Sequence, residues 1–276
     1  MKKALAIIFL IIILCTTLFM GCEKLRQPTA VNLAANTKTI SPTVTITSTV
    51  TQTPTITPTF SGTVVTTIFE YQQLPDAGYV ETYDTYISNG YSNRNRGSCD
   101  DMNVEYMLGG TLSRSLIKFR VDGYIPAGAT ILAAVFQLWI DGSGYLQGDP
   151  WDMNLRLYEI TQDWDEGTGI CQPVSDTFVS ATWNNRNTSA WAMPGGDYGQ
   201  PISNFRFIEF AEMGGFGYNE IQLDPSIVQK WLDNPAQNHG FIIKREPESG
   251  GMCTIRIATK ESASNMKPRL VVIYNP

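Results

Sequence analysis

The chain has 276 residues, of which 43% are hydrophobic and 17% charged, a composition typical of a globular protein with a sizeable core. Its formal net charge of −6 argues against nucleic acid as a partner of the whole protein, although it allows a local basic surface. Threonine, asparagine, glycine, tyrosine and tryptophan are frequent in the second half. This mixture favours strands and turns over helices.

The N-terminus has the features of an export signal. Two lysines precede an uncharged apolar run from Ala4 to Met20, and Gly21-Cys22 follows. The pattern resembles the lipobox of bacterial lipoproteins, in which the signal peptide is removed before the cysteine and a lipid is attached to its thiol. We therefore expect a lipoprotein signal peptide over residues 1–21 and lipidation of Cys22. An uncleaved membrane anchor and a plain secreted form are the alternatives, and all three place the remainder outside the cytoplasm.

A threonine- and proline-rich stretch follows the signal. Every odd position from Thr43 to Thr59 is threonine, and no charged residue occurs between Thr39 and Phe69. A period of two alone would predict a strand, but three prolines in the stretch lack the N–H group that a sheet needs. The composition is typical of extended, often glycosylated stalks. We expect residues 22–69 to be a disordered linker and residues 70–276 to be the folded domain.

Short apolar runs in the folded part alternate with polar residues and end at turns, and seven of them fit strands by this period of two. These runs lie at residues 113–122, 131–140, 153–160, 219–224, 240–246, 253–260 and 269–275. Residues 224–235 fit a helix instead, with Asp224 as N-cap, Pro225 in the first turn and Trp231 on the apolar face. The pattern predicts an all-β fold, an antiparallel β-sandwich or jelly roll with one short helix.

Several stretches, in order along the chain, resemble the DNRLRE domain, also known as carbohydrate-binding module family 96. They are YDTYISNGYSNRNRG (83–97), RSLIKFRVDGYIPAGATILAAVFQLWI (114–140), LRLYEITQDWDEGTG (155–169), SATWNNR (180–186), PGGDYG (194–199), NHGFIIK (238–244) and KESASNMKPRLVVIY (260–274). This resemblance covers nearly the whole folded part. It implies an antiparallel β-sandwich of the kind attached to extracellular polysaccharide-active enzymes, with alginate-like polyuronates among its ligands.

Basic and aromatic residues alternate outward on the predicted strands. We expect the ligand-binding residues to be Lys118, Arg120, Trp139, Arg156, Tyr158 and Arg256. If their strands belong to one sheet, its outer face suits a polyuronate, because aromatic rings cover the apolar faces of sugars and arginine pairs with carboxylates. Lys244, Lys260 and Lys267 would extend this face. An ordinary solvated strand face is the alternative.

No set of residues marks a catalytic centre. The one histidine, His239, has no nucleophile signature near it. The carboxylates that could serve glycoside hydrolysis are Asp163, Asp165, Glu166, Glu209 and Glu212, and acidic turns of this kind are common. The loop carboxylates that could bind a structural calcium ion are Asp84, Asp165, Glu166 and Asp197, without the spacing of an EF-hand.

Three cysteines belong to the folded part: Cys99, Cys171 and Cys253. They allow at most one disulfide and one free thiol, and buried or incidental thiols are the alternative. The stretch SATWNNRNTSAWAMPGGDYG, residues 180–199, is interpreted as an ordered loop that closes the sandwich.

The sequence therefore predicts a non-catalytic, lipid-anchored carbohydrate-binding protein on a bacterial cell surface, with an acidic polysaccharide such as alginate or pectin as its partner. No cofactor is expected to be required, the structural calcium ion considered above is the one candidate, and no nucleic acid is expected as a partner. A structural protein that binds the cell wall and a polysaccharide-degrading enzyme of the disaggregatase type are the alternatives.

Overall fold

The structure, a computed structural model, describes residues 63–107, 109–140, 146–147, 153–171, 180–204, 206–208, 217–263 and 265–276. The expected signal peptide, the lipidation site Cys22 and nearly all of the expected linker lie outside the described residues. Within these described ranges, no helix is both long and apolar enough to cross a membrane.

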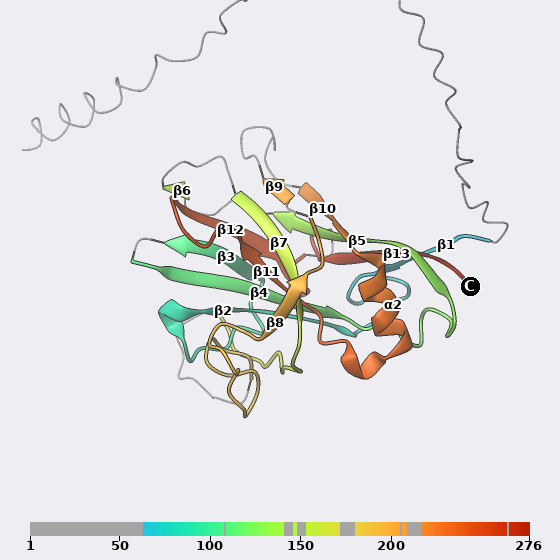
Figure 1. Cartoon of the computed structure of the whole chain (residues 1–276), viewed down its shortest axis with the longest axis horizontal. Helices are drawn as coiled ribbons and strands as arrows, with labels where there is room; N and C mark the ends of the chain where they lie inside the picture. The colour runs from blue at the N-terminus through green and yellow to red at the C-terminus, as the bar shows by residue number, and fades with distance from the viewer. Residues whose placement is uncertain are drawn as a thin grey trace, which may run out of the picture. The chain divides into compact units, whose positions relative to one another are not determined.

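The described part of the chain is built almost entirely from strands (Figure 1). In chain order the elements are β1 (Val65–Phe69), β2 (Thr82–Ser88), η1 (Asn89–Tyr91), β3 (Asp101–Met107), β4 (Thr111–Phe119), β5 (Thr130–Ile140), β6 (Leu146–Gln147), β7 (Met153–Ile160), β8 (Tyr198–Pro201), β9 (Arg206–Ile208), β10 (Gly217–Leu223), α2 (Pro225–Asp233), η2 (Pro235–Gln237), β11 (Phe241–Arg245), β12 (Met252–Ala258) and β13 (Arg269–Asn275). The paired strands are antiparallel, so the all-β prediction with a short helix is confirmed.

The strands follow one hydrogen-bonded path, β1-β13-β5-β12-β3-β4-β11-β7-β8, with β10 on β5, β2 on β4, β6 on β12 and β9 on β7. This path folds back on itself into two layers. The ring of Phe136 on β5 lies 6.2 Å from Phe119 on β4 and 5.0 Å from Phe241 on β11, although β5 is paired with neither strand. The molecule is therefore a β-sandwich, and we call β2, β4, β11, β7 and β8 its first layer and β10, β5, β13, β1, β12 and β3 its second layer.

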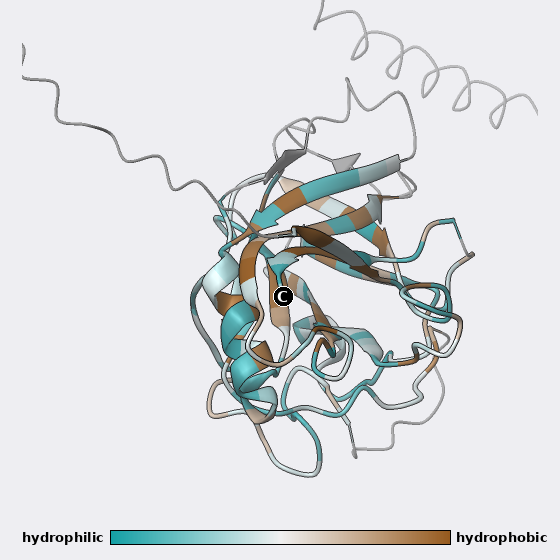
Figure 2. Cartoon of the chain, turned by 90° about the vertical axis from the view of Figure 1, so that its right-hand side faces the viewer, coloured by the Kyte–Doolittle hydropathy of each residue, from teal (hydrophilic) through white to brown (hydrophobic). Residues whose placement is uncertain are grey.

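Alternating burial along the strands defines the core between the layers. On β5, Phe136, Leu138 and Ile140 are fully buried, and the residues between them are only partly buried. Their partner strand β13 presents Leu270 and Val272 to the same core. Figure 2 shows the resulting alternation of hydrophobic and hydrophilic bands along the strands. The period of two in the sequence thus places the inward side chains correctly.

The helix α2 begins where the sequence predicts. Asp224 accepts a hydrogen bond from the Ser226 N–H at 2.9 Å, and proline occupies the first turn. Trp231 is fully buried, and its ring stacks 6.3 Å from that of Phe241. The amide of Gln229 holds the start of β5, because it accepts from the N–H of Ile131 at 2.8 Å. Capping and packing together fix the helix against β5.

The loop at residues 180–199 covers the outer face of the first layer and does not close the space between the two layers, in contrast to what the predicted closing of the sandwich would suggest. The outer face of the first layer carries apolar side chains as well as the inner face does: Ile87, Leu116 and Ile242 are fully buried there. The indole rings that cover them belong to Trp164, Trp183 and Trp191. The tryptophans thus act as anchors, but what they close is the second apolar face of β2, β4 and β11.

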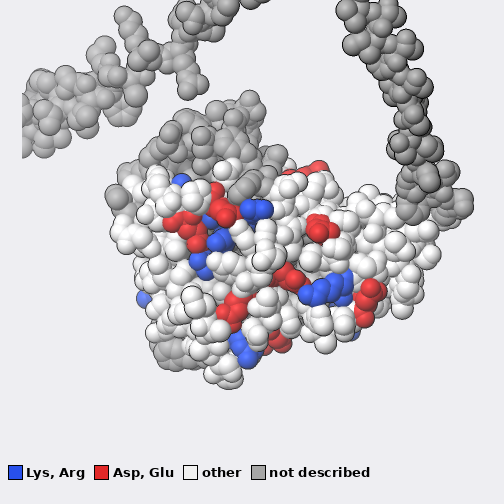
Figure 3. All heavy atoms as spheres, viewed as in Figure 1, with Lys and Arg blue, Asp and Glu red and all other residues white. Residues whose placement is uncertain are grey.

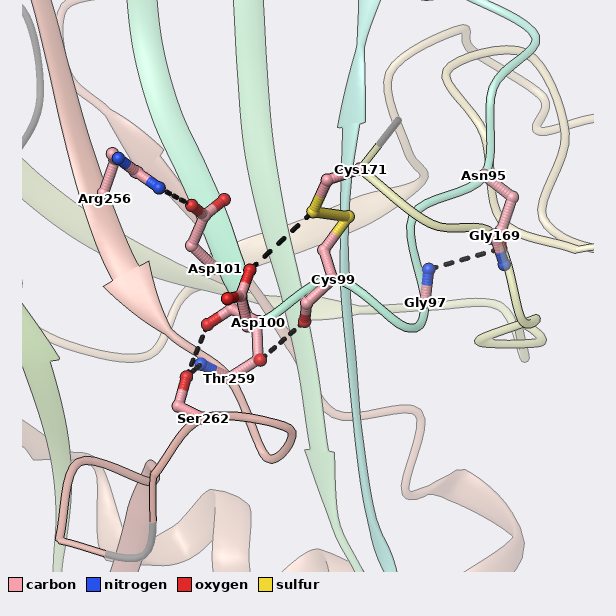
Figure 4. The surroundings of a disulfide bond; sticks show 10 residues. All are labelled: Asn95, Gly97, Cys99, Asp100, Asp101, Gly169, Cys171, Arg256, Thr259 and Ser262. Atoms are coloured by element: carbon pink, nitrogen blue, oxygen red, sulfur yellow. Dashed lines mark hydrogen bonds and ion pairs between the residues drawn. A yellow bond between two sulfur atoms is a disulfide. The ribbon is translucent and has the colours of Figure 1, made fainter. Parts of the chain in front are cut away.

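A disulfide between Cys99 and Cys171 joins the segment after β2 to the segment after β7 (Figure 4), with Cα atoms 5.2 Å apart. Beside it, the Ser98 N–H donates to the carbonyl of Gly169 at 2.8 Å. The backbones approach so closely that a side chain on Gly97 would collide with the carbonyl of Glu166. Of the two outcomes that the cysteine count allows, one bridge therefore forms, and the remaining Cys253 is a buried free thiol.

Candidate functional site

Three cations lie side by side on the outer face of the first layer. Lys244 on β11 is directly opposite Arg156 on β7. On the other side of β11, Ile243 is the last residue paired with β4, opposite Ser115. The next residue on each strand, Lys244 and Arg114, therefore continues the same register. Because paired strands lie about 4.8 Å apart, the three side chains form a row that crosses three strands. We call Arg114, Lys244 and Arg156 the cation row.

Aromatic rings fill the space between these cations. The Lys244 ammonium lies 4.8 Å from the centre of the Tyr198 ring and 4.9 Å from that of Tyr158. The Arg114 guanidinium lies 4.9 Å from the Trp183 ring and 5.4 Å from the Tyr198 ring. These distances permit cation–π attraction, which favours rigid positions for both partners.

Two carboxylates from the turn between β11 and β12 reach the cation row. Both oxygens of Glu248 accept hydrogen bonds from Arg114, each at 2.7 Å. Glu246 lies 3.6 Å from Arg156 and accepts a hydrogen bond from the Tyr158 hydroxyl. Burial and this hydrogen bond raise the pKa of Tyr158 to about 12, so the hydroxyl stays protonated at neutral pH. The three cations and two carboxylates leave the row with one positive charge in excess. Figure 3 shows basic and acidic patches side by side on the face toward the viewer.

A cavity of about 430 Å³ opens beside the Arg114 end of the row. Its walls are Arg114, Thr161, Gln162, Ala192, Met193, Pro194, Gly196, Asp197 and Tyr198. The Asp197 carboxylate shapes the rim, because it accepts the backbone N–H groups of Ala192 and Met193 at 2.8 and 2.9 Å. Met193 is 70% exposed on that rim. The hollow is large enough for a sugar residue, and its polar lining consists of a guanidinium, a phenol, one hydroxyl, one amide and the Asp197 carboxylate.

The predicted residue Lys118 lies farther along β4, beyond Leu116, and Arg120 follows directly after the end of that strand. Both line a separate cavity of about 280 Å³. Lys118 lies 3.4 Å from Asp163 and 4.9 Å from the centre of the Tyr83 ring. Arg120 is about half exposed and pairs with Asp122 at 3.0 Å, within its own turn. These two cations therefore belong to the first layer but not to the cation row.

The predicted residues Trp139 and Arg256 lie on the second layer, so the six residues do not share one face. Trp139 packs edge-on against Tyr218 of β10, with ring centres 5.4 Å apart. Arg256 forms an ion pair with Asp101 of β3. Alternation along a strand separates inward from outward positions but does not reveal to which layer the strand belongs. Of the predicted set, Arg156 and Tyr158 lie in or beside the cation row.

Several members of the site were not among the six predicted residues. Arg114 could have been found, because it occupies the same face of its strand as Lys118, four residues away. Lys244 was considered only as an extension. Tyr198 and the two glutamates give no such signal, because they approach the row from the start of the short strand β8 and from a turn, whose paths depend on the whole fold.

No family model matches the chain, and no curated protein matches it at a significant level. The likeness to the DNRLRE domain accordingly consists of the ordered stretches quoted above.

The structure brings two of the four predicted metal ligands together in a cluster around the buried Asp84 and Lys260, which the partly buried Glu166 and the exposed Glu261 complete; we call it the buried cluster after its two inner members. Glu166 accepts the Asp84 N–H at 2.6 Å and lies 3.0 Å from the Lys260 ammonium. Lys260 also pairs with Glu261, and its backbone N–H donates to Asp84 at 2.8 Å. Burial, as the largest cause, raises the pKa of Asp84 well above its ordinary value and that of Glu166 to about 7.

This cluster does not fit a calcium site. The Lys260 ammonium already supplies the positive charge, and within the described residues no group of three or more His, Cys, Asp or Glu side chains could hold a metal. Asp197 is committed to the rim of the large cavity, and Asp165 makes its backbone hydrogen bonds with Arg186 and Ala181. Asp84 and Glu166 thus share the cluster with Lys260, whereas Asp197 lies apart from them on the rim of the large cavity.

Of the candidate catalytic residues, the structure describes His239, Asp163, Asp165 and Glu166. His239 lies 3.7 Å from Asp163, which also pairs with Lys118. Glu166 belongs to the buried cluster, and Glu209 and Glu212 lie outside the described residues.

Proposed function

We propose that the protein is a non-catalytic binding protein for an acidic polysaccharide, held at a bacterial cell surface through a lipid on Cys22. The observation that carries this proposal is the cation row, interleaved with tyrosines and bordered by a cavity of about 430 Å³. Arginine pairs with carboxylates through two parallel hydrogen bonds, and aromatic rings pack on the apolar faces of sugars. Both kinds of contact meet in this one place.

The pattern of charge supports a uronate polymer rather than a duplex nucleic acid. The whole chain carries a formal charge of −6, which repels any polyanion, so binding depends on local contacts. The row has only one positive charge in excess, too few to neutralise the closely spaced phosphates of a duplex. A uronate chain offers carboxylates and apolar ring faces in alternation, which matches the alternation of cations and rings. The resemblance to the DNRLRE domain supports the same ligand class.

Native affinity electrophoresis tests the proposal. The folded domain is run through gels that contain alginate, pectin or a neutral glucan. We expect retardation by an acidic polymer, and its loss in Tyr198→Ala, which removes a ring from the cavity wall. Tyr91→Ala is the control, because Tyr91 is exposed outside this site. Unchanged mobility in all three polymers would reject the proposal and favour a structural protein that binds the cell wall.

A further inference from the structure

The turn between β11 and β12 folds over the cation row with two carboxylates only two residues apart. Glu248 makes a bidentate pair with Arg114 and also lies 3.7 Å from Lys244. Glu246 contacts Arg156 and Tyr158. All three cations of the row therefore have a carboxylate partner that comes from one short turn.

The position of this turn is fixed at its base. The Arg245 side chain donates to the carbonyl of Gly251 at 2.6 Å, and the Glu246 N–H donates to the carbonyl of Asn154 at 3.0 Å. Between these points, residues 247–250 belong to no strand. Among the described contacts, the carboxylate of Glu248 is held only by the two basic side chains. The Glu248 carboxylate can therefore leave the cation row without the loss of any hydrogen bond between strands.

The Glu248 side chain is 17% exposed and that of Arg114 is 9% exposed. A buried guanidinium without a partner is costly, so Arg114 needs a carboxylate whether or not a ligand is bound. A ligand carboxylate that enters from the adjoining cavity can take the same two N–H groups, while Glu248 turns into water. The exchange conserves the ion pair and exposes only the resident carboxylate.

We infer that Glu246 and Glu248 form a resident carboxylate pair, which occupies the anion positions of the cation row until two carboxylates of an acidic polymer displace it. This inference rests on the proposed function and adds to it a chemical requirement. The ligand must present carboxylates on neighbouring units, since one carboxylate replaces only half of the pair. The pair thereby excludes neutral glycans, because displacement by them leaves a cation of the row unpaired, and it disfavours monocarboxylates, because each can replace only one of the two glutamates.

Glu248→Gln tests this inference, because glutamine keeps the shape of the side chain and removes the charge that competes with a ligand. Glu159→Gln is the matched control: Glu159 is also ion-paired, 2.7 Å from Lys230, and its side chain is 16% exposed, but it lies outside the row. Calorimetric titration with oligouronates is the measurement. We expect Glu248→Gln to raise affinity about fivefold and Glu159→Gln to leave it within about twofold.

The outcomes separate the two proposals. If the unmodified protein binds oligouronates but Glu248→Gln binds them no more tightly than Glu159→Gln does, the resident pair is not a competitor and the inference fails alone. If neither the unmodified protein nor any variant binds, the proposed function fails with it. Glu246→Gln provides a second test should Glu248→Gln unfold, and it is expected to raise affinity in the same direction. A monouronate that binds as tightly as a diuronate would also overturn the inference.

Discussion

The side-chain amide of Asn95 makes four hydrogen bonds to backbone groups of the neighbouring loops. Its Nδ2 group donates to the carbonyls of Glu166 and Ala181 at 2.6 and 2.9 Å. Its Oδ1 atom accepts the N–H groups of Gly97 and Gly169 at 3.2 and 2.7 Å. One side chain therefore joins three separate backbone segments beside the disulfide (Figure 4). It also holds the backbone of Glu166 in the buried cluster.

We expect Asn95→Asp to lower the free energy of unfolding by about 2–4 kcal/mol. The substitution replaces the NH2 group, which donates two hydrogen bonds, with a carboxylate oxygen that faces the same two carbonyl oxygens. Asn187→Asp is the control: Asn187 uses only its oxygen, which accepts the Ser189 N–H at 2.8 Å, and aspartate retains that bond. Urea unfolding of both variants provides the comparison. Equal losses would mean that the Asn95 amide donors do not contribute to stability.

Glu166 makes stability depend on pH. Its pKa is raised from 4.5 to about 7, chiefly by burial and further by Glu261, while the Asp84 N–H and Lys260 oppose the rise. The folded state therefore retains a proton that the unfolded chain has lost above about pH 5. This contribution is fully present at acid pH and is lost as the pH rises through about 7. The loss amounts to at most about 3 kcal/mol.

Thermal unfolding between pH 5 and pH 9 measures this effect. We expect the stability of the unmodified protein to fall as the pH rises from about 5 through about 7, and that of Glu166→Gln to fall less, because glutamine stays neutral and only Asp84, whose pKa burial also raises, continues to titrate. Glu159→Gln, which lies outside the buried cluster, should keep the pH dependence of the unmodified protein. A Glu166→Gln profile parallel to that of the unmodified protein would show that another group titrates.

At the scale of elements, local signals explain which parts could be predicted. The helix α2 carries its own cap, proline and apolar face within a dozen residues, so sequence alone predicts its start at Asp224. The strands with a clear period of two, such as β5 and β13, are also predicted. The strand β1 falls within the expected linker, because VTTIF continues a threonine-rich stretch and only its pairing with β13 makes it a strand.

The disulfide belongs to this scale because it joins loops rather than strands. We expect replacement of both Cys99 and Cys171 by serine to lower the free energy of unfolding by about 2–4 kcal/mol, since the bridge closes a loop over a sequence separation of 72 residues. Cys253→Ala removes a thiol but no cross-link, so it should cost less. Urea unfolding with and without a reducing agent checks this. A double variant as stable as the oxidised protein would contradict it.

At the scale of the whole molecule, the folding of one strand path into two layers decides which side chains meet. Arg156 and Arg256 are equivalent as outward arginines in the sequence, yet they lie on different layers. The cation row needs β4, β11 and β7 side by side, although β11 follows β7 by some 80 residues in the chain. Sequence patterns predict the outward positions, but the site depends on long-range strand order.

The central claim is that the cation row, and not general basicity, binds the ligand. Its most direct test compares the oligouronate affinity of two double variants, each of which removes two positive charges. The first is Lys244→Gln with Arg156→Gln, in the row, and the second is Lys267→Gln with Arg256→Gln, outside it. Calorimetric titration should show a loss of at least about tenfold for the first pair and a change within about twofold for the second. Equal losses in both, or a loss confined to the second pair, would contradict the assignment of the binding face.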